Sequence, residues 1–300
     1  MENISCSECG YPTVCSDVEK DSSDKFLTKE DLQAQAIAKA FSRSVKAKVT
    51  PLERALNAYF TRFARKKITD LRRKGTLRMF AGGKVAKAKI KKQLTPEEED
   101  EFINIVFRYG ESAKDEEAKK AIKELGLSEA EVLPLIWPSS QRTTKRRILG
   151  ETIRNINSKS DTAIRDILAM STQETLRPSV SELSRRVTEA LKGPSGIMSP
   201  AEAKKIASTE IPSFKNFAKH EVYKKAGVSK LRWVSVIDSR TRPARERVPR
   251  ANHIVMDGRE TEVGKPFDMA VSGAKMFYPG DPDGPPFEVI NCRCTLMPIK

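Results

Sequence analysis

Apolar residues recur at helical spacing over the first two thirds of this chain, and this pattern constrains the fold more than any other feature. The clearest stripe comprises Leu52, Leu56, Tyr59, Phe60, Phe63 and Leu71. Most of the neighbouring basic residues fall between these positions, so the pattern predicts a helix with one buried face and one cationic face. A second stripe comprises Val180, Leu183, Val187 and Leu191. We therefore expect residues 25–192 to form an all-helical domain.

Helix starts are predicted at two Thr-Pro pairs. Thr50 and Thr95 are N-cap residue types, and each is followed by a proline, which suits the first turn. The acids EEED after Pro96 lie where a helix dipole favours negative charge, so they indicate a helix start and not an acidic patch. Short breaks are expected at Gly126, at residues 134–138 and at residues 177–178.

The character of the sequence changes after residue 192. Residues 193–200 hold two glycines and two prolines and predict a linker. One helix is expected from Ala201 to about Ala226, followed by a half-buried strand in LRWVSVIDS whose Trp233 belongs to the core, and then by loops rich in Gly, Pro and Asp. The whole is predicted to be α+β, with residues 201–300 as a small C-terminal domain and residues 1–24 as a tail or small module.

Positive charge is concentrated in one stretch. The net charge is +15, and residues 41–94 carry 17 Lys or Arg against two acids, so the rest is formally neutral. Such a stretch predicts non-specific binding of double-stranded DNA, with a solvated helix face as the alternative. The candidate phosphate contacts are Arg62, Arg65, Lys66, Lys67, Arg72, Arg73, Lys74, Lys84, Lys87, Lys89, Lys91 and Lys92. Tyr59, Phe60 and Phe63 are interpreted as core, although a base-stacking platform is an alternative.

The five cysteines lie at the two ends of the chain, with none between Cys15 and Cys292. An odd number in this arrangement is not a disulfide framework, so metal binding or free thiols are expected. No apolar run approaches the roughly 18 residues of a membrane span, and the polar start does not predict a secretory leader. We expect synthesis in a cytoplasm and no membrane partner.

A series of motifs in the last hundred residues resembles a known family. In order they are STE, KKAGVSKLRWVSVIDSRTR, a histidine with MDG, YPGDPDGPP and NCRC. This series resembles the C-terminal domain of phage minor head proteins, the Mu F-like or head morphogenesis family. The residues that carry the motifs are Thr209, Glu210, Trp233, Asp238, Arg240, Thr241, Arg242, His253, Asp257, Gly258 and Asn291. One departure is the segment PARERVPRAN between Arg242 and His253, because the family's histidine follows TR closely.

The resemblance implies a tailed-phage structural protein that takes part in capsid assembly and genome delivery. Its implied partners are the portal protein, other capsid or scaffold components and the packaged DNA. Its implied locations are the host cytoplasm during assembly and then the capsid interior or portal region of the virion.

Two partial metal sites are predicted. Cys292 and Cys294 in a turn can face one ion, with His253 as a third zinc ligand and Asp238 as a possible fourth. Such a site would hold the loop-rich C-terminal segment together. The alternative is a pair of reduced, half-buried cysteines beside a hydrogen-bonded histidine. Near the start of the chain, Cys6, Cys9 and Cys15 form a second, less complete set.

Signals for catalysis are few. There is no glycine-rich phosphate loop or nucleophile elbow, and His220 is interpreted as a surface residue of a Lys-rich helix. Asp281 and Asp283 are interpreted as turn formers. Arg240 and Arg242 are expected either to bind phosphate or to fix loops through Asp238 and carbonyl groups.

We therefore expect a protein that is not an enzyme. The alternatives are a metal-dependent nuclease that uses His253 and Asp238, and a zinc-stabilised DNA-binding module.

Overall fold

The computed structural model describes residues 28–81, 94–128, 139–171, 173–174, 178–238, 240–242 and 250–299. The chain separates into two compact units, Met1–Gln33 and Ala34–Lys300. The described part of the first unit is only the beginning of the first helix. The fold of residues 34–300 is therefore the fold of almost everything described.

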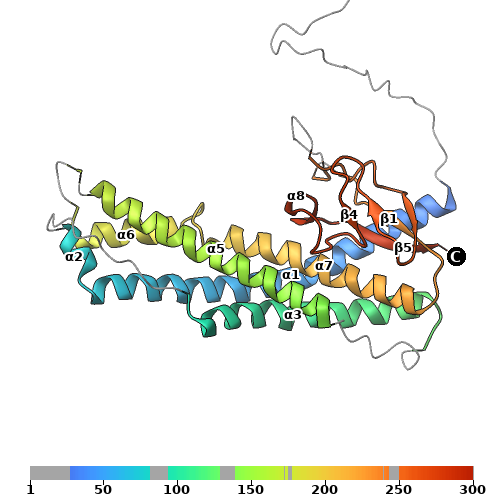
Figure 1. Ribbon diagram of the computed structural model, residues 1–300, viewed down its shortest axis with the longest axis horizontal. Coiled ribbons are helices and arrows are strands. Elements are labelled where there is room, and N and C mark those ends of the chain that lie inside the picture. The colour runs from blue at the N-terminus through green and yellow to red at the C-terminus, as the bar shows by residue number, and fades with distance from the viewer. Residues whose placement is uncertain are drawn as a thin grey trace, which may run out of the picture. The chain divides into compact units, whose positions relative to one another are not determined.

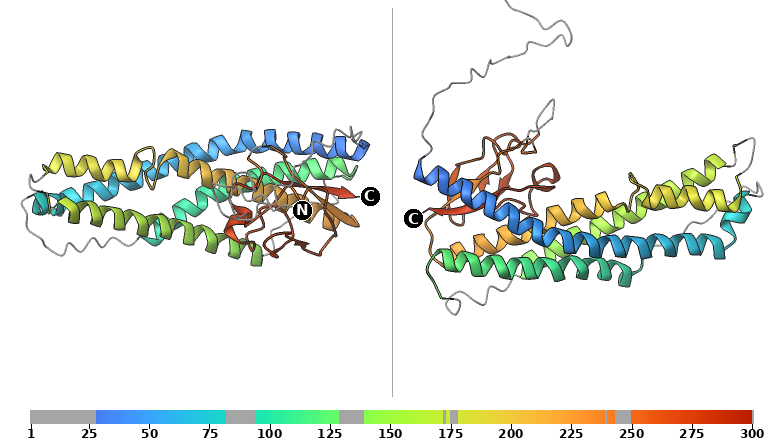
Figure 2. Two further views of the ribbon diagram at one scale, coloured as in Figure 1. Left: turned by 90° about the horizontal axis from the view of Figure 1, so that it is seen from above. Right: turned by 180° about the vertical axis from the view of Figure 1, so that it is seen from behind.

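Helices make up most of this fold (Figure 1). They are α1 (Lys29–Arg73), α2 (Thr76–Ala81), α3 (Pro96–Glu124), α5 (Ser139–Ser171), α6 (Val180–Lys192), α7 (Pro200–Lys225) and the short α8 (Pro286–Val289). Helix α7 packs along α3, and both views in Figure 2 show the long helices side by side with the strands gathered at one end. Among the described residues, no helix is long and apolar enough to cross a membrane.

Among the described residues after α7 there are five short strands. They are β1 (Lys230–Val234), β2 (Glu260–Glu262), β3 (Phe267–Asp268), β4 (Lys275–Met276) and β5 (Thr295–Ile299). One antiparallel sheet has the order β2-β1-β5, with Trp233 opposite Leu296, and β3 pairs with β4 in a second. The predicted α+β class is confirmed, and the strand expected in LRWVSVIDS is β1.

Most of the predicted helix ends are confirmed. Thr95 caps α3 in a capping box: its hydroxyl accepts the Glu98 N–H at 3.3 Å, and the Glu98 carboxylate accepts the Thr95 N–H at 3.0 Å. Ser179 caps α6 by accepting the Glu182 N–H at 3.1 Å. Helix α7 ends just before Gly227, whose φ of 70° suits glycine.

The predicted helix start at Thr50 is wrong. Helix α1 runs through Pro51, and the Thr50 hydroxyl bonds back to the carbonyl of Lys46, within the helix. An interior proline removes one backbone donor and costs about 3 kcal/mol. Because Val49 and Leu52 on either side are buried in the core, continuing the helix preserves apolar burial that ending it would lose.

The predicted core residues are buried in one continuous cluster. Tyr59, Phe60 and Phe63 pack in it against Phe102 of α3, so they are core residues and not a base-stacking platform. Trp233 is fully buried, as expected.

Residues 34–300 form one compact unit, which differs from the expected division into two domains. Residues 193–199 connect α6 to α7, close to the expected linker 193–200, but α7 packs on α3 of the helical part. The contact is close, because the ring of Phe214 on α7 lies against the backbone of Gly110 on α3. The helix expected to open a separate C-terminal domain is thus central to the helical core.

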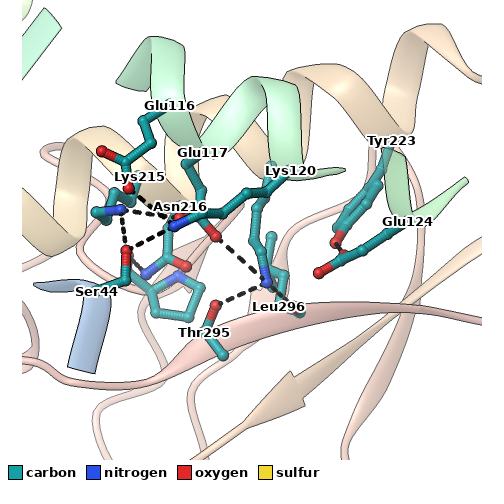
Figure 3. Close-up of polar contacts among 12 residues, drawn as sticks. Ser44, Glu116, Glu117, Lys120, Glu124, Lys215, Asn216, Tyr223, Thr295 and Leu296 are labelled. Carbon is teal, nitrogen blue, oxygen red and sulfur yellow. Dashed lines mark hydrogen bonds and ion pairs between the residues drawn. The ribbon is translucent and has the colours of Figure 1, made fainter. Parts of the chain in front are cut away.

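Buried charged groups also join these two helices (Figure 3). Lys215 of α7 is fully buried, with its Nζ 2.9 Å from a carboxylate oxygen of Glu117 on α3 and 2.6 Å from the Ser44 hydroxyl of α1. One turn further on, Lys219 lies 3.8 Å from Glu117 and donates to the Leu296 carbonyl at 3.1 Å. Burial lowers the pKa of Lys219. One carboxylate therefore faces two buried ammonium groups.

Candidate metal centre

The turn before β5 and the loop after β1 meet because β1 and β5 are paired. Cys292 and Cys294 lie between α8 and β5, and Asn291 has a positive φ of 57°, which turns the chain there. His253 lies in the loop between β1 and β2. The Ser235 hydroxyl, just after β1, donates to the His253 carbonyl at 2.7 Å. Sheet pairing thus brings residues about forty positions apart together.

His253, Cys292 and Cys294 have the geometry of a metal site. The Nδ1 atom of His253 lies 3.6 Å from the Cys292 sulfur and 3.4 Å from the Cys294 sulfur. All three possible ligand atoms lie within 4.8 Å of one another, and all three residues are buried. In tetrahedral zinc sites, bonds of about 2.0–2.3 Å separate neighbouring ligands by roughly 3.6 Å. The three residues therefore fit zinc, and the predicted ligand set is compatible with it.

Glu288 completes the surroundings of His253. Its carboxylate lies 2.7 Å from Nε2, the ring nitrogen that faces away from the sulfurs, and its other oxygen accepts the Ser272 hydroxyl at 2.6 Å. Glu288 is fully buried. A carboxylate in this position fixes the ring orientation and the tautomer that presents Nδ1 to a metal. The sequence analysis missed Glu288, although an acid four residues before a candidate cysteine ligand was a usable signal.

The same contacts set the protonation of the site without metal. Burial lowers the pKa of His253, but hydrogen bonds with Cys294 and Glu288 raise it more, to about 9. Burial raises the pKa of Cys294, but hydrogen bonds from Cys292 and His253 hold it well below its usual range. The hydrogen bond with Cys294, together with burial, raises the pKa of Cys292. Metal binding needs both cysteines as thiolates and a neutral His253, so a cation entering the site displaces protons.

Asp238, predicted as a fourth ligand, is not in the ligand group. The Arg293 guanidinium donates to both oxygens of the Asp238 carboxylate, through Nη1 at 2.7 Å and also through Nη2. The Arg240 guanidinium lies 3.3 Å from the same carboxylate. The hydrogen bonds from Arg293 hold the pKa of Asp238 well below its usual range. The ligand prediction is therefore wrong for Asp238, because neighbouring guanidinium groups occupy its oxygens.

The arginines of the SRTR motif fix loops. Arg242 donates to the Glu288 carbonyl at 3.1 Å and to the Ile290 carbonyl, while Thr241 bonds to the Val236 carbonyl. Loop fixing through Asp238 and carbonyl groups is thus confirmed for the motif. These bonds hold the segment after β1 against the turn that carries the cysteines.

The extra segment between Arg242 and His253 does not separate these two residues in space. The His253 N–H donates to the Arg242 carbonyl at 3.0 Å, and the Ile254 N–H donates to the same carbonyl at 3.3 Å. Arg242 and His253 are therefore adjacent in space although ten residues separate them in the sequence. His253 thus lies next to the TR pair in space, although it does not follow the pair closely in sequence.

The remaining motif residues form hydrogen bonds around the three candidate ligands, or join α7 to neighbouring parts of the fold. The Asn291 N–H donates to the Thr209 hydroxyl at 3.1 Å, and the Asp257 carboxylate accepts the Ser235 N–H at 2.7 Å. The Gly258 N–H donates to the Trp233 carbonyl at 2.9 Å, and the Trp233 ring lies edge-on to that of His253. Glu210 forms a buried ion pair with Lys145 of α5 at 2.6 Å.

A cavity of about 250 Å³ opens beside the three candidate ligands. Its lining includes His253, Cys292 and Cys294 together with Arg240, Arg242 and Arg293. The candidate metal site therefore faces a positively charged cavity.

His220 is buried, and its prediction as a surface residue is wrong. Only 4% of it is exposed, its ring packs against Tyr278, and its Nδ1 lies 3.0 Å from Glu221. Helix α7 is Lys-rich, but α3 and the loop around Tyr278 cover it on more than one face. In that loop, the Asp281 carboxylate accepts the N–H groups of Phe277 and Asp283, which confirms the predicted turn.

The basic stretch is more neutralised than its sequence implies. Arg62 lies 2.5 Å from Glu101 of α3, and Lys66 lies 2.5 Å from Glu98 of the same helix. Lys67 is buried and pairs with Asp161 of α5 at 2.5 Å. The prediction that Lys67 contacts DNA is wrong, because its ammonium group faces the interior.

Six of the predicted DNA contacts among the described residues are exposed. Arg62 and Lys66 are paired with acids of α3, and the other four are Arg65, Arg72, Arg73 and Lys74. Arg72 also donates to Ser184, and Arg73 pairs with Asp70 at 3.3 Å. Arg65 and Lys74 form no ion pair with a described residue. Lys84, Lys87, Lys89, Lys91 and Lys92 lie outside the described residues, as do Cys6, Cys9 and Cys15.

One protein with a similar sequence is "Uncharacterized protein YqbB" of Bacillus subtilis (strain 168), which is 32% identical over 98 residues. The aligned region covers 32% of this chain and 30% of the relative, so the chain spans less than a third of that protein's length. No family model and no solved structure matches the chain.

Proposed function

We propose that this chain is a minor head protein of a tailed phage, similar to the Mu F-like family. In this role it is not an enzyme: it associates with the portal protein and other capsid components in the host cytoplasm and is retained in the virion. The observation that carries the proposal is the convergence of the motifs on which the resemblance rests. Thr209 and Asn291 lie 82 residues apart in sequence yet share a hydrogen bond. His253 remains beside Arg242 despite the inserted segment.

The proposal is tested by association. The full chain is co-expressed with the portal protein encoded next to it and purified through a tag on the portal. We expect co-purification, and mass spectrometry of purified phage particles should detect the chain in few copies. Lack of a neighbouring portal gene, together with absence of the chain from the particles, would contradict the head role.

We further propose that zinc bound by His253, Cys292 and Cys294 stabilises the C-terminal loops. Buried ligand atoms at zinc-like separations, and a carboxylate behind the histidine, support this. The purified full chain should contain zinc, and Cys292→Ser and Cys294→Ser should lose it and melt at lower temperature. Cys9→Ser is the matched control, because it removes a thiol outside this site. Zinc that disappears only in Cys9→Ser would assign the metal to the other end of the chain.

DNA binding through the basic stretch is the other part of this role. The support is the exposed group Arg65, Arg72, Arg73 and Lys74 at the end of α1. Phosphate contacts give affinity without base preference, and each contributes about 0.9 to the slope of log affinity against log salt. Replacing these four residues by Gln should reduce that slope. The control replaces Lys224, Lys225, Lys230 and Lys265 by Gln, which removes the same number of charges outside the basic stretch. An equal reduction of the slope in this control would show that DNA does not bind through the end of α1.

A metal-dependent nuclease is the second candidate. The observation that favours it is a three-ligand site beside a cavity, because catalytic zinc sites combine three protein ligands with an open position. The test is DNA cleavage by the zinc-loaded chain and by His253→Ala. Cleavage that depends on both zinc and His253 would favour the nuclease over the head protein.

A further inference from the structure

We infer that a metal held by His253, Cys292 and Cys294 keeps a fourth coordination position that faces the cavity and binds a small anion from solvent. This inference rests on the zinc site proposed above, but not on the head role. It concerns what the site recognises once metal is bound.

The count of available ligands is the first argument. Among the described residues, the group that can hold a metal has three members and no fourth His, Cys, Asp or Glu. The nearest carboxylate, Glu288, lies on the Nε2 side of the His253 ring, and both its oxygens have partners, His253 and Ser272. The Ser235 hydroxyl lies 3.3 Å from the Cys294 sulfur but is hydrogen-bonded to the His253 carbonyl. A tetrahedral zinc ion therefore needs one ligand from elsewhere.

The second argument is access. All three ligand residues line the cavity of about 250 Å³, so an ion held among them would have space beside it for a further ligand. Sites for drug-sized molecules usually have volumes of about 300–1,000 Å³. A cavity of this volume has room for an ion of a few atoms, such as azide, acetate or phosphate.

Charge decides between a neutral and an anionic ligand. The lining of the cavity includes three arginines and no carboxylate, and Asp238 pairs with two of these arginines, Arg240 and Arg293. Arg240 is the arginine with most freedom, because 73% of its side chain is exposed and its partner Asp238 is also held by Arg293. Guanidinium groups bind oxyanions through paired donors, so the arginines of the lining favour an anion.

Cobalt substitution makes the coordination visible. The full chain is stripped of metal, loaded with Co²⁺ and titrated with azide, while its visible absorption is recorded. We expect the cobalt bands to change and to saturate with azide, and phosphate or acetate to compete. Arg240→Gln should still bind cobalt but should weaken the azide affinity by up to about fivefold, as expected for a partly exposed charge. Lys265→Gln removes an exposed charge from a residue that does not line the cavity and should leave the affinity unchanged.

Each outcome separates the hypotheses. Cobalt bands that ignore azide, phosphate and acetate would mean a closed site, which overturns this inference and leaves the zinc site intact. Failure of the chain to bind cobalt or zinc would overturn both. Equal weakening by Arg240→Gln and Lys265→Gln would mean a general charge effect and would refute a role for the cavity. None of these results depends on association with a portal protein.

Discussion

Replacing Glu117 by Gln should destabilise the protein strongly, because Glu117 is the carboxylate that faces two buried lysines (Figure 3). Its side chain is 5% exposed and lies 2.9 Å from Lys215 and 3.8 Å from Lys219. Lys215 also donates a hydrogen bond to the Ser44 hydroxyl, which carries no charge. The variant would thus remove the carboxylate that lies closest to both buried ammonium groups.

The magnitude follows from this burial. Removing one partner of a buried ion pair costs about 3–5 kcal/mol, whereas an exposed pair contributes about 0–1 kcal/mol. For a unit of this size, 1 kcal/mol corresponds to roughly 2–4 °C in melting temperature, so Glu117→Gln should lower it by about 6–20 °C. Glu116 next to it pairs with Lys48 and Lys120 but is 38% exposed. Glu116→Gln is therefore a matched control, with an expected cost below about 1 kcal/mol.

The assay is thermal and urea unfolding of both variants at neutral pH, followed by circular dichroism. A double variant, Glu117→Leu with Lys215→Met, should recover part of the loss, because replacing a buried pair by apolar groups is often neutral or stabilising, whereas Lys219 still loses its contact with Glu117. Equal stability of Glu117→Gln and Glu116→Gln would refute the argument that burial sets the cost.

Three further predictions concern packing, metal affinity and pH. Gly110→Ala should destabilise by about 1–3 kcal/mol in thermal melting despite its better helix propensity, because the new Cβ would lie 2.5 Å from the Phe214 ring; a raised melting temperature would contradict this. Glu288→Gln should weaken zinc affinity about 10–100-fold in competition with a coloured chelator, and unchanged affinity would exclude a role in orienting His253. Hydrogen bonds from Lys120 and Lys48 lower the pKa of Glu116 from 4.5 to about 2, so its stabilisation is complete above pH 4.5 and is lost as the pH falls towards 2. Urea unfolding at about pH 5 and about pH 3 should therefore show that Glu116→Gln loses less stability on acidification than the unaltered protein does. The difference should be less than about 1 kcal/mol because the ion pair is partly exposed, and an identical loss of stability in both proteins would refute this.

Several features of the fold were predictable because they depend on neighbours in sequence. The capped start of α3 at Thr95 and the end of α7 before Gly227 follow from residue types within one helical turn. The stripe around Tyr59 and Phe60 predicted a buried helix face for the same reason. Pro51 is the exception, because its local signal ends a helix and only the burial of Val49 and Leu52 on both sides explains why α1 continues.

Part of the candidate metal site was also accessible from the sequence. Two cysteines in a turn and a single histidine in a loop-rich segment are residue types with a common chemistry, so they could be grouped without a structure. The identity of the acid could not, because Asp238 and Glu288 are chemically similar. Pairing of β1 with β5 places Glu288 behind His253 and leaves Asp238 to Arg293.

The sequence by itself determined the α+β class, the main helix ends, the apolar faces and the types of metal ligand available, since each follows from periodicity or local residue chemistry. Only the tertiary structure decided which charges are used inside the protein. Lys67 pairs with Asp161 and so does not face solvent, Lys215 is buried against Glu117, and His220 is buried beside Tyr278. The physical reason is that ion pairs and burial depend on distance through space, and partners such as Lys67 and Asp161 are 94 residues apart along the chain.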